Sequence, residues 1–464
     1  MVKFNFENKK KVHFIGIGGI SMSAIALILL KNGFIVQGSD QSLNENVKML
    51  KDKGIKIFIG HNKENITSDI DIVVYSKAIH SDNEEFMEAE KLGLTLMSRS
   101  KILGEIMANY KQKICIAGTH GKTTTTSLVS KVLLDIKLNP TINVGGIVDE
   151  IGGNSYISDN KDLFVAEACE YTNSFLDFVA DIEVITNIEE DHLDFFKDLD
   201  DIRKSFKKFI ELLPDNGFLV INNRIENIDE LTKNTKARII IYGDDQSADY
   251  YFDNVSYDDN FYQSFDVYKK KTFIGRMRQK LIGRHNALNF LAAFAVLDNL
   301  GVDFETVKNS LMDFKGARRR LELKGVKDNI SYIDDYAHHP TEIEASIKAL
   351  NELKYNDLYL IFQPHTFTRT KALFKDFVRV LGDIPNVILA KIYPAREIDD
   401  GSISANDIKN SIKNDTTNKN NICEYFEKFE DIIDFVSKKA KKNDIIVTMG
   451  AGDIYKLHNL LGLK

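Results

Sequence analysis

The stretch GTHGKTTTT, residues 118–126, decides the fold of the middle of this chain. It lies between the apolar segment KICIA and a segment whose apolar residues recur on one helical face, so we expect a strand, a glycine-rich loop and a helix. In such a loop the backbone amides face the phosphates of a nucleotide, Lys122 reaches the β- and γ-oxygens, and the Thr123 hydroxyl can bind Mg²⁺. Ile116 replaces the first glycine of the usual motif, and these contacts survive that loss. The stretch predicts a site for ATP, and the alternative is a glycine turn with an exposed lysine.

A second glycine cluster, GIGGIS, lies near the start of the chain. It matches the GxGxxG pattern of dinucleotide sites at Gly16 and Gly18, with Ser21 in place of the third glycine. Asp40 lies about where an acidic side chain would meet a ribose hydroxyl. The pattern alone leaves three interpretations: a nicotinamide dinucleotide site, a site for another nucleotide phosphate, or a tight turn. The ATP loop downstream favours a nucleotide-linked substrate.

The composition is that of a globular protein that does not attract polyanions. The 464 residues are 43% hydrophobic and 28% charged, with 61 basic against 68 acidic side chains and a net charge of -7. This balance disfavours nucleic acid and membrane surfaces as partners. The three cysteines lack the spacing of a metal site, and no segment has the pattern of a signal peptide or the length of a membrane span. We therefore expect reduced thiols and a cytoplasmic protein.

Alternation of apolar strands with helical segments predicts an α/β fold of three units. The usual domain size of roughly 100 to 200 residues is consistent with that number. We expect a Rossmann-like unit at residues 1–109, a phosphate-loop unit at 110–314 and a further α/β unit at 315–464. Polar and apolar residues alternate near 250–282, which predicts a small meander beside the middle sheet.

Two strands of the middle unit end in side chains that can bind a metal ion. FVAEACEY contains Glu167 and Glu170. ITNIEEDHLDFF contains a second set: Glu189, Glu190, Asp191, His192 and Asp194. Parallel strands beside a phosphate loop present their carboxyl ends to the same crevice, where a carboxylate can complete the shell of Mg²⁺. Glu167 is the preferred ligand because it directly follows the strand, and His192 is either a second ligand or a helix cap; the remaining acidic residues are expected to form a solvated surface.

Two further clusters lie between the middle and the third unit. GRHNALNF places Asn286 and Asn289 three residues apart on one helical face, where they suit an adenine edge or cap the helix. GARRRLE contains three arginines at the predicted junction. Such a run is usually solvated, but guanidinium groups also stabilise the charge that develops during phosphoryl transfer.

The third unit has its polar residues directly after two apolar strands, in DDYAHHPTEI and QPHTFTRT. This set suits a small zwitterion, with Arg369 for the carboxylate and Asp335 or His338 near the amine. Adjacent histidines point in different directions, so we expect no chelating pair. A helix-capping turn with Pro340 at the first helical position explains DDYAHHP equally well.

Nine segments, taken in order and spacing, resemble the Mur ligases of peptidoglycan synthesis. They are HFIGIGGISMSAIA, AGTHGKTTTT, EACEYTNSFL, TNIEEDHLDFF, GRHNALNFLAA, FKGARRRLE, DDYAHHPTEI, FQPHTFTRTKAL and TMGAGDIY. The resemblance covers essentially the whole chain. GTHGKTTTT together with DDYAHHP is similar to the branch that joins L-alanine to UDP-N-acetylmuramate. The resemblance implies the three-domain Mur ligase architecture, with a Rossmann-like N-terminal domain for the UDP-sugar, a central P-loop ATPase domain and a Rossmann-like C-terminal domain for the amino acid.

The resemblance also implies a reaction in which ATP activates a carboxylate. The lactoyl carboxylate of UDP-N-acetylmuramate would attack the γ-phosphate to form an acyl phosphate, and the amine of L-alanine would then displace phosphate. Mg²⁺ or Mn²⁺ would assist the reaction. The enzyme would be a monomer or a weak homodimer.

The same resemblance assigns roles to individual residues. Those implied at ATP are Gly118, Thr119, His120, Gly121, Lys122, Thr123, Thr124, Asn286, Asn289 and Arg320. Those implied in catalysis are Lys122, His192, Arg320 and Asp335. Those implied around the metal ion are Thr123, Glu167 and His192. Those implied at the UDP-sugar or the alanine are Gly18, Asp40, Ser76, Arg99, His338, His365 and Arg369.

Three other functions stay open at this point. A recycling ligase, which joins a whole tripeptide to the same UDP-sugar, is the nearest alternative. An NAD-dependent dehydrogenase would explain GIGGIS but not GTHGKTTTT. A non-catalytic nucleotide-binding switch would explain the loop but not DDYAHHP.

Overall fold

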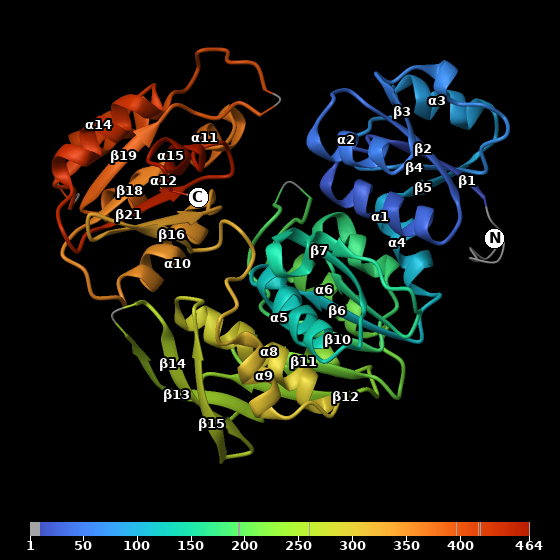
Figure 1. Ribbon diagram of the computed structural model, residues 1–464, viewed down its shortest axis with the longest axis horizontal. Coiled ribbons are helices and arrows are strands. Elements are labelled where there is room, and N and C mark those ends of the chain that lie inside the picture. Colours follow the sequence, from blue (N-terminus) through green and yellow to red (C-terminus); the bar gives the residue numbers. More distant parts are fainter. Residues whose placement is uncertain are drawn as a thin grey trace. The chain divides into compact units, whose positions relative to one another are not determined.

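The computed structural model describes residues 10–193, 195–258, 260–395, 397–415, 417 and 419–463 (Figure 1). These residues form two compact units. The first comprises the chain up to residue 254 with segments 265–277 and 286–312, and the second comprises segments 255–264 and 278–285 with the chain from residue 313. Within the described ranges, no helix combines the length and apolar character that crossing a membrane requires.

The first sheet is parallel and has the strand order β3-β2-β1-β4-β5. Its strands are β1 (Lys11–Ile15), β2 (Ile35–Asp40), β3 (Lys56–Ile59), β4 (Ile72–Tyr75) and β5 (Thr95–Ser98). The helices of this region are α1 (Ile20–Lys31), α2 (Glu45–Asp52), η1 (Lys63–Asn65), α3 (Glu84–Lys91) and α4 (Arg99–Met107). Helix α1 ends before Gly33, whose φ of 84° is the left-handed conformation that glycine adopts at low cost. The strand order reverses between β1 and β4, and loops that leave a parallel sheet at such a point form a crevice at its carboxyl edge.

The second sheet has ten strands in the order β15-β14-β13-β12-β11-β10-β6-β9-β7-β8. Its first five strands are β6 (Gln112–Ala117), β7 (Thr141–Val148), β8 (Gly153–Tyr156), β9 (Leu163–Glu167) and β10 (Ile182–Ile185). The others are β11 (Phe218–Asn222), β12 (Arg238–Gly243), β13 (Tyr250–Tyr257), β14 (Gln263–Lys269) and β15 (Thr272–Gln279). Its helices are α5 (Lys122–Asp135), η2 (Asp149–Ile151), η3 (Tyr171–Asp177), α6 (Leu199–Ile210), α7 (Ile228–Thr232), α8 (Arg284–Asn299) and α9 (Phe304–Leu311). The predicted meander is confirmed, because β13, β14 and β15 neighbour one another in chain order at one edge.

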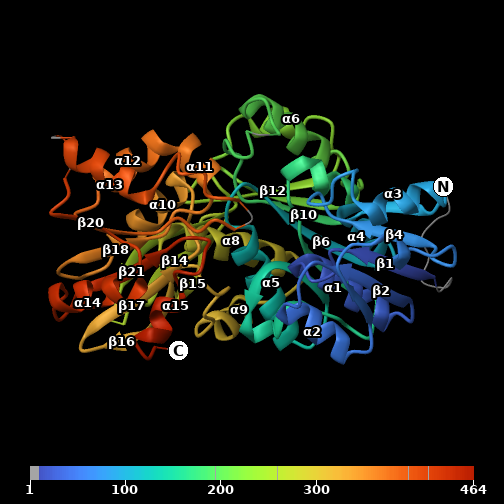
Figure 2. The same cartoon turned by 90° about the horizontal axis from the view of Figure 1, so that it is seen from above.

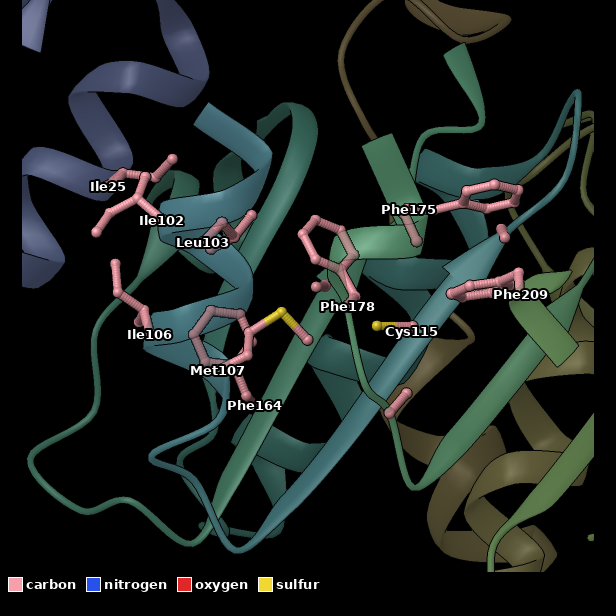
Figure 3. Close-up of a cluster of buried hydrophobic side chains, with 14 of the residues drawn as sticks. Ile25, Ile102, Leu103, Ile106, Met107, Cys115, Phe164, Phe175, Phe178 and Phe209 are labelled. Carbon is pink, nitrogen blue, oxygen red and sulfur yellow. The ribbon is translucent and has the colours of Figure 1, made fainter. Parts of the chain in front are cut away.

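The apolar core of the first unit is continuous from α1 and α4 into the ten-stranded sheet (Figure 3). Phe175 and Phe209 stack at the far end of this cluster with ring centroids 4.5 Å apart. Gly104 lets α4 approach η3 closely, since an added Cβ there would lie 2.1 Å from the carbonyl oxygen of Asp177. These contacts fix the first sheet against the second, and both sheets belong to the same unit.

The third sheet has the order β16-β17-β21-β18-β19-β20, and only its edge pair β16 and β17 is antiparallel. Its strands are β16 (Glu322–Lys327), β17 (Ile330–Asp335), β18 (Leu358–Phe362), β19 (Asn386–Ala390), β20 (Ile422–Phe426) and β21 (Ile445–Met449). Its helices are α10 (Pro340–Leu350), α11 (Phe367–Ala372), α12 (Phe374–Gly382), α13 (Ala405–Asn414), α14 (Phe429–Lys439) and α15 (Lys456–Leu460). Helices α10, α12 and α13 pack on one face, and α14 and α15 on the other (Figure 2).

One end of the meander belongs to the second unit, although the sequence pattern assigns all of residues 110–314 to the middle unit. The Tyr257 hydroxyl donates a hydrogen bond of 2.5 Å to Glu352, and the Tyr257 and Phe261 rings pack against the core beneath α10 and α12. The alternating pattern of these strands predicts which side chains face a core, but it does not say which core they face.

Candidate active site

The phosphate loop connects β6 to α5 and depends on two glycines. Gly118 has a φ of 130° and Gly121 one of 82°, which L side chains rarely adopt. A Cβ added at Gly118 would lie 2.0 Å from the hydroxyl of Thr186, and one added at Gly121 would lie 2.5 Å from Asn289 Oδ1. The loop therefore needs glycine both for its backbone conformation and for its close packing.

Lys122 begins α5 and directs its ammonium to the centre of the loop. Nζ donates to the carbonyls of Gly118 and Thr119 and lies 3.0 and 3.1 Å from the two carboxylate oxygens of Glu170. Its side chain is only 13% exposed. Burial lowers the pKa of the ammonium, but Glu170 together with Cys169 and Glu167 outweighs this and the net pKa is raised. Lys122 is therefore a fixed positive charge at neutral pH.

Thr123, the next residue, is tied to the end of β9. Its hydroxyl donates a 2.9 Å hydrogen bond to Glu167, which also accepts one of 2.8 Å from the amide of Gly145. Strand β6 lies between β9 and β10, so the loop is flanked by the carboxyl ends of both neighbours. On the β10 side, Asn187 Oδ1 accepts from the His120 amide at 2.7 Å. The two strands that we expected to carry metal-binding side chains, β9 and β10, therefore both end beside this loop.

Glu170, Asp191 and His192 form a group that can hold a cation, with one ligand atom from each lying within 4.8 Å of the others. Glu170 is buried and the other two are half-buried. His192 has a φ of 53°, and the Tyr171 ring packs on its imidazole with ring centroids 4.5 Å apart. His192 lies in a loop, and the helix that follows, α6, is capped by Asp198 instead. The helix-cap interpretation of His192 is therefore wrong.

The acidic residues around this group divide into two kinds. Glu189 and Glu190 are exposed, as expected of a solvated surface. Glu170 is only 2% exposed, so that expectation is wrong for it, whereas Asp191 is half-buried beside His192. Asp194 lies outside the described residues. The sequence could have indicated Asp191, since it directly precedes His192.

Asn286 and Asn289 lie inside α8 and are buried, so the capping interpretation is wrong for both. Asn289 Nδ2 donates to Asn286 Oδ1 at 3.0 Å, and the hydroxyl of Thr125 donates to Asn289 Oδ1 at 3.3 Å. The pair is thus linked to the first turn of α5 beside the phosphate loop. Thr124, also on this turn, is buried.

A second cluster lies at the carboxyl edge of the third sheet, in the second unit. Asp335 ends β17, and its carboxylate accepts from the Ala337 amide at 2.9 Å and from the Ser346 hydroxyl at 2.8 Å. Burial raises the pKa of Asp335, and the positive charge of Arg320 opposes this. The guanidinium of Arg320 also lies 5.8 Å from the centre of the Tyr336 ring.

His338, His365 and Arg369 complete this second cluster. The two imidazole rings are 6.1 Å apart, and Arg369 Nη1 donates to His365 Nδ1 at 3.1 Å. Burial and the adjacent Arg369 lower the pKa of His365 to about 4, and burial also lowers the pKa of His338. Both imidazoles are therefore neutral at pH 7, but only His338 is available as a proton acceptor, because His365 Nδ1 already accepts from Arg369. His339 instead caps α10 by accepting from the Thr341 amide, which confirms that the adjacent histidines do not act as a pair.

Next to this cluster lies an ion pair that the sequence did not indicate. Arg319 Nε donates to Asp334 at 3.1 Å, and its Nη atoms donate to the carbonyls of Gly450 and Gly452. Thr448 donates to the other Asp334 oxygen at 2.7 Å. Arg319 thus connects the segment between α9 and β16, which also contains Arg320, to the loop after β21. Within a run of three arginines, nothing in the sequence distinguishes this residue from the one that follows it.

The residues predicted for the UDP-sugar lie at the carboxyl edge of the first sheet. Gly18 follows β1, Asp40 ends β2, Ser76 follows β4 and Arg99 begins α4 directly after β5. Asp40 accepts a 2.9 Å hydrogen bond from the Gly18 amide, so in this structure it fixes the glycine turn. Ser76 and Arg99 are half-buried.

Family comparisons agree with this layout. The Mur ligase family catalytic domain matches residues 11–111, the Mur ligase middle domain matches 116–297 and the Mur ligase glutamate ligase domain matches 319–452. These matches together span well over half of the chain. The chain belongs to the Mur ligase family.

This Mur ligase is similar along its length to proteins named for one reaction. It is 45% identical over 458 residues to a UDP-N-acetylmuramate-L-alanine ligase of Lachnospira eligens, covering 98% of this chain and 99% of that protein. It is 44% identical to one of Clostridium botulinum strain Loch Maree, covering 98% of both. The solved UDP-N-acetylmuramate-alanine ligase of Thermotoga maritima superposes with a TM-score of 0.80 at 29% identity and 98% coverage of both chains. The murein peptide ligase of Psychrobacter arcticus shares the fold, with a TM-score of 0.68 at 24% identity over 97% of this chain and 98% of its own.

The three-domain α/β architecture expected of a Mur ligase is therefore confirmed. Its ATP loop, cation-ligand group and paired asparagines gather in the first unit. Arg320, Asp335, His338, His365 and Arg369 gather in the second. The roles assigned to these residues by resemblance stay predictions.

Proposed function

We propose that this Mur ligase joins L-alanine to the lactoyl carboxylate of UDP-N-acetylmuramate at the expense of ATP, giving UDP-N-acetylmuramoyl-L-alanine, ADP and phosphate. The observation that carries the proposal is the position of Lys122, a buried ammonium at the centre of a glycine loop, in a chain 45% identical to ligases of that name. Residues 1–109 would hold the UDP-sugar, 110–314 the ATP, and 315–464 would bring the amino acid.

In the first step, a lactoyl oxygen attacks the γ-phosphorus and the bond to the β-phosphate oxygen breaks. Negative charge grows on the phosphoryl oxygens, and a fixed cation stabilises it without reorganisation. Lys122 meets this requirement because its pKa is raised and its ammonium is held by loop carbonyls. Arg320 is proposed as a second cation for these oxygens. Asn286 and Asn289 would hold the loop in shape beside the nucleotide.

The cation-ligand group fits the divalent ion that such a reaction requires. Two carboxylates and an imidazole within 4.8 Å are a donor set that Mg²⁺ or Mn²⁺ accepts. We propose Glu170, Asp191 and His192 as its holders, with Glu167 and Thr123 as the neighbouring ligands that the sequence selected. When bound, the ion would neutralise phosphate charge.

In the second step, the amine of alanine attacks the acyl carbon and phosphate leaves. The ammonium of free alanine must first lose a proton, and a neutral imidazole can take it. His338 is neutral at pH 7, and its Nδ1 donates to the Tyr336 carbonyl, so its Nε2 is the acceptor; Arg369 offers a guanidinium for the alanine carboxylate. Asp335 would hold Arg320 through its charge. Closure around the acyl phosphate would exclude water.

The cellular location, the partners and the oligomeric state are proposed on the same basis. ATP and a UDP-sugar are cytoplasmic metabolites, so the chain would work in the cytoplasm. It would act without nucleic acid or membrane, as a monomer or weak homodimer.

Phosphate release from ATP tests the function. It should require UDP-N-acetylmuramate and rise with L-alanine. Ligation of L-alanyl-γ-D-glutamyl-diaminopimelate in place of alanine would identify the recycling ligase instead. Phosphate release without the sugar nucleotide, or oxidation of NADH, would contradict both ligase assignments.

A further inference from the structure

Glu85, in the first turn of α3, is fully buried, yet its carboxylate accepts hydrogen bonds from several sides. The Ser39 hydroxyl donates at 2.5 Å and the Asn65 amide group at 2.6 Å. His13 Nε2 lies at 3.2 Å and the Asn62 backbone amide at 3.3 Å. Burial raises the pKa of Glu85, but the hydrogen bonds from His13 and the other donors lower it by more, so the net pKa is below the usual range. The carboxylate is charged at neutral pH.

Gln37 sets the donor and acceptor roles of the histidine in this network. Gln37 Nε2 lies 3.1 Å from His13 Nδ1 and also donates to the Asn65 carbonyl at 3.3 Å, which sets the orientation of the amide. An amide nitrogen only donates, so Nδ1 of His13 accepts and the ring proton lies on Nε2, directed at Glu85. His13 therefore donates to Glu85 through Nε2.

Ser39 connects this network to the glycine turn after β1. Its hydroxyl belongs to the network, and its carbonyl accepts from the amides of Gly16 and Ile17, each at 2.9 Å. The next residue, Asp40, accepts from the amide of Gly18 at 2.9 Å. Two adjacent residues at the end of β2 thus hold three consecutive amides of the turn. The turn leads directly into α1, whose N-terminal amides are a natural site for phosphate.

Stability alone does not explain why a charged network lies in this position. Burying a carboxylate is costly, and well-packed apolar residues are often as stable or more stable in its place. The neighbouring buried residues on this side of the sheet include Ile15, Ile66 and Val73, so an apolar alternative is compatible with the surroundings. What the network adds is a hydrogen bond that holds the Ser39 side chain, beside the pairing of the Ser39 backbone with β1 and β3, and no apolar side chain could supply it.

We propose that Glu85 is a positioning residue for the UDP-sugar: by holding Ser39, it fixes the glycine turn and the start of α1 against which the diphosphate binds. The inference rests on the proposed function, since it takes the first sheet as the UDP-sugar site. Glu85 does not touch the substrate. It acts through Ser39 and the turn.

Steady-state kinetics of Glu85→Gln test this inference. Glutamine has the same shape, but its amide nitrogen replaces an acceptor with a donor, so at least one of the donors around it loses its partner. The KM for UDP-N-acetylmuramate should rise on the order of tenfold, as expected for one lost buried hydrogen bond to a charged group. The KM values for ATP and L-alanine, and kcat at saturation, should change less than twofold. Glu84→Gln, an exposed neighbour on the same helical turn, is the matched control and should change nothing.

Ser39→Ala provides an independent variant in case Glu85→Gln does not fold. It removes one donor and leaves the carboxylate with its other partners, so a smaller rise in the same KM is expected. An unchanged KM for the sugar nucleotide in a folded variant, or an equal rise in all three KM values, would overturn the positioning role while leaving the proposed function intact. Absence of turnover by the wild-type chain with UDP-N-acetylmuramate would overturn the proposed function itself.

Discussion

The ammonium of Lys122 and the carboxylate of Glu170 lie 3.0 Å apart and join the phosphate loop to the cation-ligand group. Glu170 also approaches His192, with 3.9 Å between the carboxylate and Nε2. One buried carboxylate therefore touches both the lysine predicted to bind phosphate and the histidine predicted to bind metal.

Replacing Glu170 by glutamine should lower kcat strongly and affect the binding of the UDP-sugar little. The change removes the charge of one member of the cation-ligand group and the counter-ion of Lys122, and the loss of one preorganised charged group typically costs about 10² to 10³ in kcat. Phosphate release under saturating substrates measures it. Glu189→Gln, an exposed acid on the adjacent loop, is the control. A kcat within twofold of wild type would remove Glu170 from the site.

Gly121→Ala should destabilise the chain more than Gly152→Ala does. Both glycines have nearly the same φ, 82° and 84°, so the backbone penalty of about 1 to 2 kcal/mol is common to them. Only Gly121 faces a close neighbour, because a Cβ there meets Asn289 at 2.5 Å whereas none lies within 4 Å of Gly152. Overpacking adds about 1 to 3 kcal/mol. Urea unfolding of both variants measures the difference.

Adding Asn289→Ala to Gly121→Ala should recover part of the lost stability, because it removes the atom that a Cβ would meet. The KM for ATP should be raised in the double variant, since the asparagine pair would be broken. Equal destabilisation by Gly121→Ala and Gly152→Ala would show that the packing of the loop against α8 is not tight.

Asp334 should make stability fall as the pH rises through the weakly acidic range. Burial raises its pKa to about 6 despite the nearby Arg319, whereas the ordinary value is 3.8. Between these two pH values the folded chain holds a proton that the unfolded chain has released, so this contribution is lost as the pH rises from about 4 to about 6. Relative to Asp334→Asn, wild type should lose roughly 3 kcal/mol across that window. Parallel curves of unfolding free energy against pH for the two proteins would contradict the burial effect.

His365 should remain neutral until the pH approaches about 4. Arg369→Met removes the adjacent cation and should raise the pKa of His365, although burial would still hold it below 6.5. NMR titration of histidine ring signals measures both values. Arg379→Met, which removes an exposed arginine on α12, is the control and should leave the titration unchanged. An ordinary pKa in wild type would contradict the effect of burial and of Arg369 on this imidazole.

Much of the fold could be predicted from the sequence, because glycine turns and apolar periodicity determine structure locally. The strand before GTHGKTTTT, the end of α1 at Gly33 and the meander of β13–β15 all follow from turn residues and periodicity. The membership of the meander tip in the second unit did not follow. It depends on contacts such as that between Tyr257 and Glu352, which are far apart in the chain.

The candidate site likewise contains residues that the sequence could predict and residues that it could not. Lys122 was predictable because a single loop determines its position. Glu170 was not distinguished from the exposed acidic residues, since a short polar stretch after a strand does not show which side chain turns inward. Thr172, Asn173 and His192 next to these residues have left-handed backbone, which no short motif encodes.

Isotope transfer tests the central claim most directly. If ATP is used to activate the lactoyl carboxylate, UDP-N-acetylmuramate labelled with oxygen-18 in that carboxylate should pass one labelled oxygen to the released phosphate during ligation to L-alanine. Mass spectrometry of the phosphate would detect it, and Lys122→Ala should abolish both the transfer and peptide-bond formation. Ligation that proceeds with unlabelled phosphate, or that continues unchanged without Lys122, would contradict the account.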